Sequence, residues 1–266
     1  MSLSFNKKLN ASIKQKRSNL CIGLDIDSDR MPNAADKTLP GLKSYLKDII
    51  DSTTDISCAY KLNMAFYERY GSEGYKLMED IVSYIDSRNI TIADGKRGDI
   101  GNTTNKYAIS IFNIIGFDSI TVSPYMGSDS ILPFIDNKEN GVFILCLTSN
   151  KSSADIQMIK EKDIYVYDKV SHLANNLNSN DNIGLVIGAT KAESMNRIRK
   201  QNSLPWLIPG IGAQGGDLEE SVKISNSNDS DGLINVSRGI IFAGDCKIEE
   251  VRKAAVSYNE NINRYK

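Results

Sequence analysis

Histidine, paired cysteines and long apolar runs are scarce or missing in this chain, and each shortage excludes a class of protein. The 266 residues include one histidine, His172, and four cysteines with no Cys-x-x-Cys pair. Zinc sites are built from clusters of these residues, and a Ser-His-Asp triad would have to use His172 alone. The longest apolar runs, such as VFILCL at 142–147, are far too short to span a bilayer.

Charge of either sign is also not in excess, since 32 Lys and Arg residues nearly cancel 33 Asp and Glu residues. No broad field should therefore attract nucleic acid or an anionic membrane, although a local basic pocket is still allowed. The first 19 residues, MSLSFNKKLNASIKQKRSN, are basic but lack the apolar segment of a secretory signal. Cys21, Cys58 and Cys146 fall in expected strands, where free cysteine behaves as a small apolar residue. We therefore expect a cytoplasmic protein with reduced cysteines.

Short apolar runs alternate with helix-length segments from one end of the chain to the other. We expect strands at 20–24, 57–62, 90–93, 119–122, 142–147, 184–187, 206–208 and 232–236. We expect helices at 41–52, 71–87, 102–115, 163–177 and 247–263, and solvated loops at 149–155 and 175–182, the first a candidate lid. Eight such units in about 250 residues are typical of a closed (β/α)8 TIM barrel, an α/β fold.

An open doubly wound sheet is the alternative architecture. It usually has fewer strands and a Gly-x-Gly-x-x-Gly turn after the first one, which is absent here. No linker rich in proline, glycine or serine divides the chain. We therefore expect a single domain over 1–266, with 1–18 as an N-terminal helical extension.

Polar and charged residues follow the apolar runs, and in a βα barrel the carboxyl ends of the strands carry the active site. These residues should therefore converge on one rim. They are Asp25 after the first strand, Lys61 and Asn63 at the second, Asp94 and Lys96 at the third, Thr148 and Ser149 at the fifth, and Ser237 and Arg238 at the eighth.

The stretch ITIADGKRGDI at 90–100 carries the highest density of charge. Residues two apart on a strand share a face, so Asp94 and Lys96 should point the same way, within reach of Lys61 on the neighbouring strand. Asp99 can fold back onto Lys96 or extend to another subunit. Flanking carboxylates would keep Lys96 protonated, and a fixed ammonium can stabilise a carbanion and then protonate it. An ion-pair network that only holds the third loop is the alternative.

A phosphate site is expected after the last two strands, where barrels frequently bind phosphate through backbone N–H groups. The segment GIGAQGG at 210–216 supplies flexible backbone and the amide of Gln214. Arg238 in SRGI, at 237–240, follows the last strand and supplies a guanidinium group that can bind phosphate through two N–H donors.

Together these residues resemble the orotidine 5′-monophosphate decarboxylase family, in order and spacing over the whole barrel. The family's Asp-x-Lys-x-x-Asp-Ile signature is present as Asp94-Gly95-Lys96-Arg97-Gly98-Asp99-Ile100. The resemblance implies decarboxylation of orotidine 5′-monophosphate to UMP, the last step of de novo pyrimidine biosynthesis. It also implies that the enzyme needs no cofactor or metal and is a homodimer whose two sites share residues.

The same resemblance assigns a role to each matching position. Lys96 would protonate C6 of the pyrimidine, and Asp94 would hold Lys96 near the departing carboxylate. Asp99, Ile100 and Thr103 would reach into the partner's site. Asp25 and Lys61 would hydrogen bond to the ribose, with Asn63 nearby, and Thr148 or Ser149 would contact the edge of the pyrimidine. Gln214 and Arg238 would bind the phosphate in a pocket shaped by Pro209 and Gly239.

Three other functions remain open at this point. A sugar-phosphate decarboxylase or aldolase of the same superfamily would need a glutamate for Mg²⁺ at the end of the second strand, where this chain has Lys61. A Schiff-base aldolase would need a lysine of lowered pKa, whereas two aspartates should raise the pKa of Lys96. A non-catalytic nucleotide-binding protein could keep the same pocket.

Overall fold

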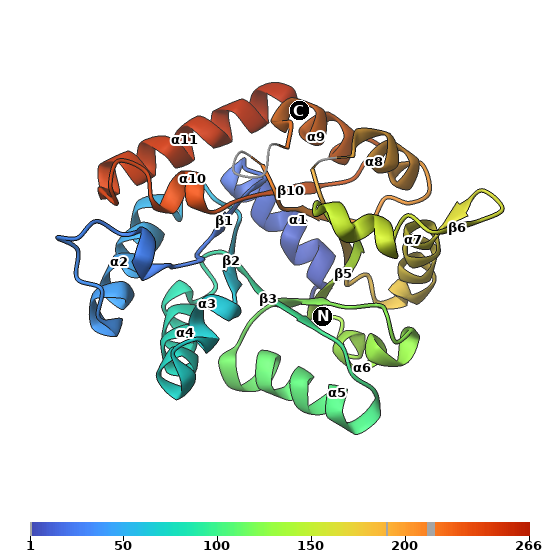
Figure 1. Ribbon diagram of the computed structural model, residues 1–266, viewed down its shortest axis with the longest axis horizontal. Coiled ribbons are helices and arrows are strands. Elements are labelled where there is room, and N and C mark those ends of the chain that lie inside the picture. Colours follow the sequence, from blue (N-terminus) through green and yellow to red (C-terminus); the bar gives the residue numbers. More distant parts are fainter. Residues whose placement is uncertain (1, 190, 212–215) are drawn as a thin grey trace.

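A closed barrel of eight parallel strands forms the centre of the molecule (Figure 1). This computed structural model describes residues 2–189, 191–211 and 216–266. The barrel strands are β1 (Leu20–Gly23), β2 (Ala59–Asn63), β3 (Ile90–Arg97), β4 (Ser119–Val122), β5 (Gly141–Leu147), β8 (Ile183–Ile187), β9 (Trp206–Ile208) and β10 (Gly232–Val236). All eight expected strands are present, so the predicted (β/α)8 barrel is confirmed. The open doubly wound sheet is excluded because β1 pairs with β10.

Helices follow the strands and surround the barrel. They are α2 (Leu39–Thr53), α3 (Ala65–Glu68), α4 (Gly71–Ile85), α5 (Gly101–Ala108) continued by a π-helix (Ile109–Ile115), α6 (Leu132–Ile135), α7 (Val166–Leu177), α8 (Ala192–Arg199), α9 (Leu218–Ser225), α10 (Arg238–Ile241) and α11 (Ile248–Tyr265). Short 3₁₀ turns lie at Ser28–Arg30, Ser128–Ser130, Lys151–Asp155 and Asn178–Asn180. Within the described part of the chain, no helix is long and apolar enough to cross a membrane.

Two expected boundaries are wrong. The helix predicted at 163–177 begins only at Val166, because Ile164–Tyr165 (β7) pairs with Lys160–Glu161 (β6) in a small antiparallel hairpin. Tyr165 then caps α7, since its backbone N–H donates to the Asp168 carboxylate at 2.9 Å. The expected loop at 175–182 is instead the end of α7 followed by a 3₁₀ turn.

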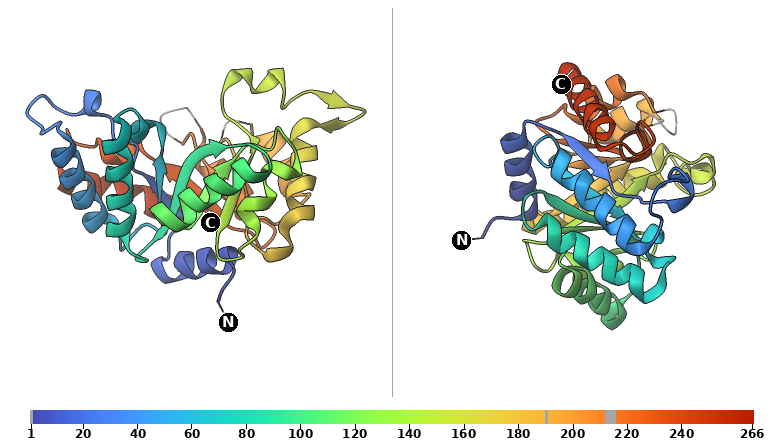
Figure 2. Two further views of the ribbon diagram at one scale, coloured as in Figure 1. Left: turned by 90° about the horizontal axis from the view of Figure 1, so that it is seen from below. Right: turned by 90° about the vertical axis from the view of Figure 1, so that its left-hand side faces the viewer.

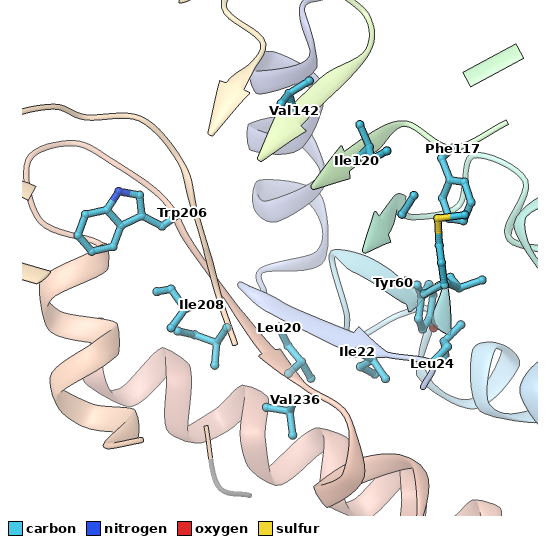
Figure 3. Close-up of a cluster of buried hydrophobic side chains, with 14 of the residues drawn as sticks. Leu20, Ile22, Leu24, Tyr60, Phe117, Ile120, Val142, Trp206, Ile208 and Val236 are labelled. Atoms are coloured by element: carbon cyan, nitrogen blue, oxygen red, sulfur yellow. The ribbon is translucent and has the colours of Figure 1, made fainter. Parts of the chain in front are cut away.

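Alternate residues of each strand point to opposite faces, which divides the core into two layers. The outer layer packs the strands against the helices through residues such as Leu20, Ile22, Tyr60 and Val236, all fully or nearly fully buried (Figure 3). The inner layer fills the barrel itself with side chains such as Phe143, which alternate with the outward-facing residues.

Helix α1 (Phe5–Lys16) closes the amino end of the barrel (Figure 2). Its buried face of Phe5, Leu9 and Ile13 joins the inner layer, and the Phe5 ring meets the Phe143 ring edge to face with centroids 5.9 Å apart. The predicted N-terminal helix therefore completes the barrel core, and the open end is the carboxyl end of the strands.

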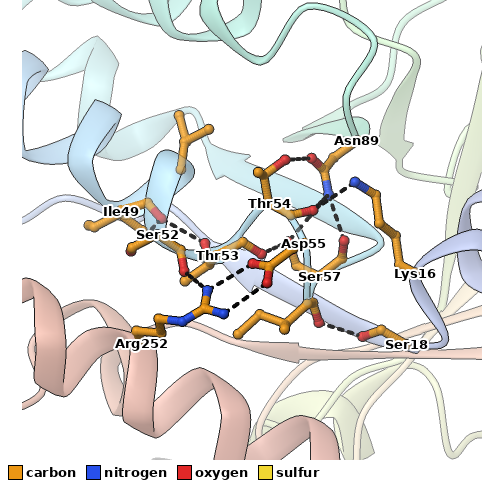
Figure 4. Close-up of polar contacts among 12 residues, drawn as sticks. Lys16, Ser18, Ile49, Ser52, Thr53, Thr54, Asp55, Ser57, Asn89 and Arg252 are labelled. Atoms are coloured by element: carbon orange, nitrogen blue, oxygen red, sulfur yellow. Dashed lines mark hydrogen bonds and ion pairs between the residues drawn. The ribbon is translucent and has the colours of Figure 1, made fainter.

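Polar contacts at the amino end fix α11 and α1 to the connection between α2 and β2 (Figure 4). Arg252 of α11 donates two hydrogen bonds of 2.8 Å to the Asp55 carboxylate, and Lys16 of α1 donates to the Thr54 carbonyl at 2.7 Å. Asn89, ahead of β3, donates to the Ser57 carbonyl at 2.6 Å. These contacts stabilise the end of the barrel that lies away from the polar rim described next.

Candidate active site

The inward-facing residues of β2 and β3 change from apolar to charged along each strand. On β3, Ile90 and Ile92 belong to the inner core layer, and Asp94 follows at the next inward position. On β2, Ala59 is followed inward by Lys61. Because parallel strands place their carboxyl ends at the same rim, the apolar floor of the barrel gives way to a charged opening.

A continuous chain of ion pairs crosses this opening from β1 to β3. Lys61 Nζ lies 3.4 Å from Asp25 Oδ1 and 3.1 Å from Asp94 Oδ2. Lys96 Nζ lies 2.6 Å from Asp94 Oδ1. The order is therefore Asp25, Lys61, Asp94, Lys96, with Lys61 buried, Asp94 mostly buried and the Lys96 side chain 50 % exposed toward the cavity. The predicted contacts of Asp94 with both lysines are confirmed.

The two inner charges stabilise one another. Burial favours the neutral form of Lys61, but the carboxylates of Asp25 and Asp94 outweigh burial and hold the pKa of Lys61 above its ordinary value. Burial likewise favours neutral Asp94, but Lys61 and Lys96 outweigh it and lower the pKa of Asp94. Both groups are therefore charged at neutral pH.

The third predicted carboxylate, Asp99, is not part of this chain of charges. Its Oδ1 accepts a hydrogen bond of 2.8 Å from the backbone N–H of Ile100. Among the described residues no ion pair joins Asp99 to Lys96, so of the two arrangements left open for Asp99, the fold-back onto Lys96 is not seen within the single chain. Ile100 is 52 % exposed and Thr103 is also exposed, and neither lines the cavity.

The backbone of the signature segment is irregular at Lys96. The pairing of β3 with β4 shifts between Ala93 and Arg97, and Lys96 has a φ of 46° in the left-handed region. Such a conformation in a residue other than glycine is strained and needs support from its surroundings. A Cβ at Gly95 would lie 2.7 Å from Met64 Sδ, so a larger residue there would require the Met64 side chain to move. Arg97 turns outward and pairs with Glu68.

The charges border a cavity of about 430 Å³ at the open end of the barrel. This volume is within the range of small-molecule sites. Of the residues predicted from the sequence, those that line it are Asp25, Lys61, Asn63, Asp94, Lys96, Thr148, Ser149, Pro209, Ser237, Arg238 and Gly239, with Gly210 and Ile211 of the glycine-rich segment. Gln214 lies outside the described residues.

Three polar residues of the cavity were not predicted: Asn150, which follows Ser149, and two residues within strands. Thr121 lies on β4 and hydrogen bonds to Asp94, and Asn235 lies on β10 beside Cys21, with Cys21 Sγ 3.6 Å from Asn235 Oδ1. Thr121 and Asn235 lie within apolar runs and not after them, so the pattern of polar residues at the strand ends does not indicate them. The alternation of inward-facing and outward-facing residues along each strand was the signal that could have placed both side chains inside the barrel. Burial raises the pKa of Cys21 to about 12, so its thiol is neutral.

Comparison with known proteins agrees with this geometry. The model of the orotidine 5′-phosphate decarboxylase / HUMPS family matches residues 18–254. The chain belongs to that family. A relative named orotidine 5′-phosphate decarboxylase from Dehalococcoides mccartyi (strain CBDB1) is 40 % identical, with 99 % of each chain covered. Another of the same name from Christiangramia forsetii is 44 % identical over 90 % of each chain.

The family also accounts for the three-dimensional structure. The solved structure of Leishmania donovani OMP decarboxylase superposes with a TM-score of 0.87 at 38 % sequence identity, covering 99 % of both chains. Lys61 argues against the magnesium-dependent sugar-phosphate decarboxylases and aldolases that were considered as an alternative. Its ammonium is buried at the end of β2, between Asp25 and Asp94, where it would repel a divalent cation.

Proposed function

We propose that this protein decarboxylates orotidine 5′-monophosphate to UMP in de novo pyrimidine biosynthesis. The observation that carries the proposal is the Lys96 ammonium, which is held 2.6 Å from Asp94 at the edge of the cavity. Relatives of the same length named orotidine 5′-phosphate decarboxylase support the same reaction. Free cysteines throughout the described chain accord with a reducing compartment, and we place the enzyme in the cytoplasm.

The chemistry requires a cation at a fixed position. When the bond between C6 and the carboxylate breaks, carbon dioxide leaves and the electron pair stays on C6. This pair lies in the ring plane, orthogonal to the π system, so the ring cannot delocalise it. The Lys96 ammonium stabilises the developing charge and then transfers a proton from Nζ to C6, giving UMP. The neutral amine regains a proton from water.

The rest of the cavity supplies groups suited to the other parts of the nucleotide. We assign the ribose hydroxyls to Asp25 and Lys61, with Asn63 nearby, and the phosphate to Arg238. Arg238 lines the cavity together with Pro209 and Gly239, after the last two barrel strands, where βα barrels commonly bind phosphate. We assign the contact with the edge of the pyrimidine to Thr148 or Ser149.

Thr148 is held in place more tightly than an exposed loop residue would be. Its backbone N–H donates to Gln157 Oε1 at 2.8 Å, and its hydroxyl lies 2.7 Å from Asn150 Oδ1. Lys191 Nζ lies 2.5 Å from the Ser153 hydroxyl and ties the Lys151–Asp155 turn to the segment before α8. These contacts favour a fixed wall for the pyrimidine on this side of the cavity.

We further propose a homodimer in which Asp99, Ile100 and Thr103 contribute to the partner's site. None of the three lines the cavity of its own chain. Exposed apolar side chains also occur on α5 and on the loop after β4, among them Tyr107, Tyr125 and Met126. Exposed apolar surface of this kind supports an interface.

The reaction is tested by following the loss of orotate absorbance on addition of orotidine 5′-monophosphate, with and without EDTA. We expect decay at the same rate in both. Lys96→Ala should lose nearly all turnover and still bind UMP. Decay that EDTA abolishes would show that the reaction needs a divalent cation and would refute the metal-free mechanism. Tight UMP binding without any decay would select a binding protein. An active Lys96→Ala variant would refute the mechanism.

Shared sites are tested by mixing two inactive variants, Lys96→Ala and Asp99→Ala. A mixed dimer holds one intact site, built from Lys96 of one chain and Asp99 of the other. Random exchange should therefore restore about a quarter of the original activity. No recovery, with exchange shown by differently tagged subunits, would contradict the shared site.

A further inference from the structure

Thr121 lies on β4, opposite the irregular part of β3. The pairing of β3 with β4 runs from Ala93 with Ile120 to Arg97 with Val122. Asp94, Gly95 and Lys96 therefore share Thr121 as the one residue facing them on β4. Its side chain is 1 % exposed and borders the cavity.

The hydrogen bonds of the Thr121 hydroxyl have only one consistent direction. The backbone N–H of Lys96 can only donate, so Thr121 Oγ1 accepts this bond, at 3.0 Å. The hydroxyl proton is then free for Asp94 Oδ1, which lies 3.1 Å away and, being ionised, can only accept. One neutral group thus contacts both members of the Lys96–Asp94 ion pair.

Each of those contacts meets a need of the site. The Lys96 backbone has a φ of 46°, and the bond from its N–H to Thr121 supports that strained conformation. Asp94 Oδ1 already accepts from Lys96 Nζ at 2.6 Å, and Thr121 holds the same oxygen from a second direction. The Lys96 side chain is half exposed and pairs directly with Asp94, which Lys61 also holds. Thr121 therefore contacts both the backbone of Lys96 and its ionic partner.

We propose that Thr121 is a positioning residue for the decarboxylation, which fixes the Lys96 ammonium by holding its backbone and its carboxylate partner at once. The inference rests on the proposed function. It predicts that the Thr121 hydroxyl contributes to the rate of the chemical step and little to the binding of UMP, because Thr121 donates its proton to Asp94 rather than to the nucleotide.

The test replaces Thr121 with Val, which keeps the shape and removes the hydroxyl, and with Ser, which keeps the hydroxyl. A hydrogen bond to a charged group corresponds to roughly a 10- to 100-fold effect, so we expect Thr121→Val to lower kcat by that factor. UMP affinity should change by less than about 3-fold, which is less than the effect of a lost hydrogen bond to a charged group. Thr121→Ser should recover most of the lost rate.

Ser119→Ala is the matched control. Ser119 lies two residues earlier on β4, is fully buried, and donates to the Thr91 carbonyl of β3 at 3.2 Å, away from the charges. Its removal should lower Tm, as Thr121→Val should, without a loss of kcat. Thr121→Ala serves as a second variant without the hydroxyl if Thr121→Val does not fold.

Three results would overturn the proposal while leaving the proposed function intact. These are full kcat in Thr121→Val, a loss that Thr121→Ser does not recover, and a loss of kcat equal to that of Ser119→Ala. If neither hydroxyl-free variant folds while Thr121→Ser does, the hydroxyl serves the barrel itself and the assignment is wrong. An unaltered protein without decarboxylase activity would instead refute the proposed function.

Discussion

Replacing Asp94 with Asn should reveal how strongly the buried charges at the barrel opening depend on one another. The change keeps the size of the side chain and removes its charge. Lys61, whose side chain is 4 % exposed, would then have only Asp25 at 3.4 Å, and Lys96 would lose its partner at 2.6 Å. Breaking a buried ion pair from one side costs about 3–5 kcal/mol, because the other charge stays buried without compensation.

For a domain of this size that loss corresponds to a fall in Tm of roughly 6–20 °C. The free energy of unfolding is measured by urea unfolding, monitored by circular dichroism at one protein concentration. Asp80→Asn is the control, since Asp80 also bridges two lysines, Lys43 at 2.6 Å and Lys76 at 3.0 Å, but on the surface. Exposed pairs contribute little, so its effect should be far smaller. Equal losses in the two variants would refute the reasoning.

The dependence on pH provides a second check on the same variant. Because the pKa of Asp94 is lowered in the folded protein, its ionised form contributes stability above the unfolded pKa of 3.8, and this contribution is lost as the pH falls through the lower folded pKa. The difference in unfolding free energy between the protein and Asp94→Asn should therefore be complete at pH 7 and shrink below about pH 4. A difference that grew on acidification would have the wrong sign.

Two further predictions concern the phosphate side and the floor of the barrel. Arg238→Ala should lower kcat/KM by about 10- to 100-fold, as expected for a lost bond to a charged group, although Arg238 does not touch the reacting carbon; steady-state kinetics with unchanged kcat/KM would contradict the phosphate role. Phe5→Ala should lower the free energy of unfolding by about 3–5 kcal/mol, because the Phe5 ring is fully buried against Phe143; urea unfolding with a loss below about 1 kcal/mol, less than a typical buried aromatic truncation, would show that α1 is not part of the core.

The barrel could be predicted because each strand is an apolar run bounded by polar residues, and that pattern survives without tertiary context. The charges at the strand ends were found for the same reason. Thr121 was not predicted, because its importance arises from the shifted pairing of β3 with β4. The sequence of one strand alone does not determine how it pairs with its neighbour. The hairpin before α7 was missed because apolar residues at 164–165 fit a helix as well as a strand.

Asp99 shows a different limit. Its place in the signature indicated a contact with Lys96, yet spacing alone left open whether that contact lies within the chain or across an interface. The structure removes the first alternative, because the Asp99 carboxylate accepts from the neighbouring Ile100 N–H instead. The second alternative concerns a surface that two chains form together, so it depends on packing that no single strand or helix determines.

Both chain ends are anchored on the sealed side of the barrel. The Ser4 hydroxyl donates to Asp181, just before β8, and Lys266 lies 4.0 Å from Asp231, just before β10. A peptide tether joined to either end would thus leave from the face opposite the cavity. The enzyme can be immobilised on a resin or sensor through either terminus with its entrance turned toward the solution.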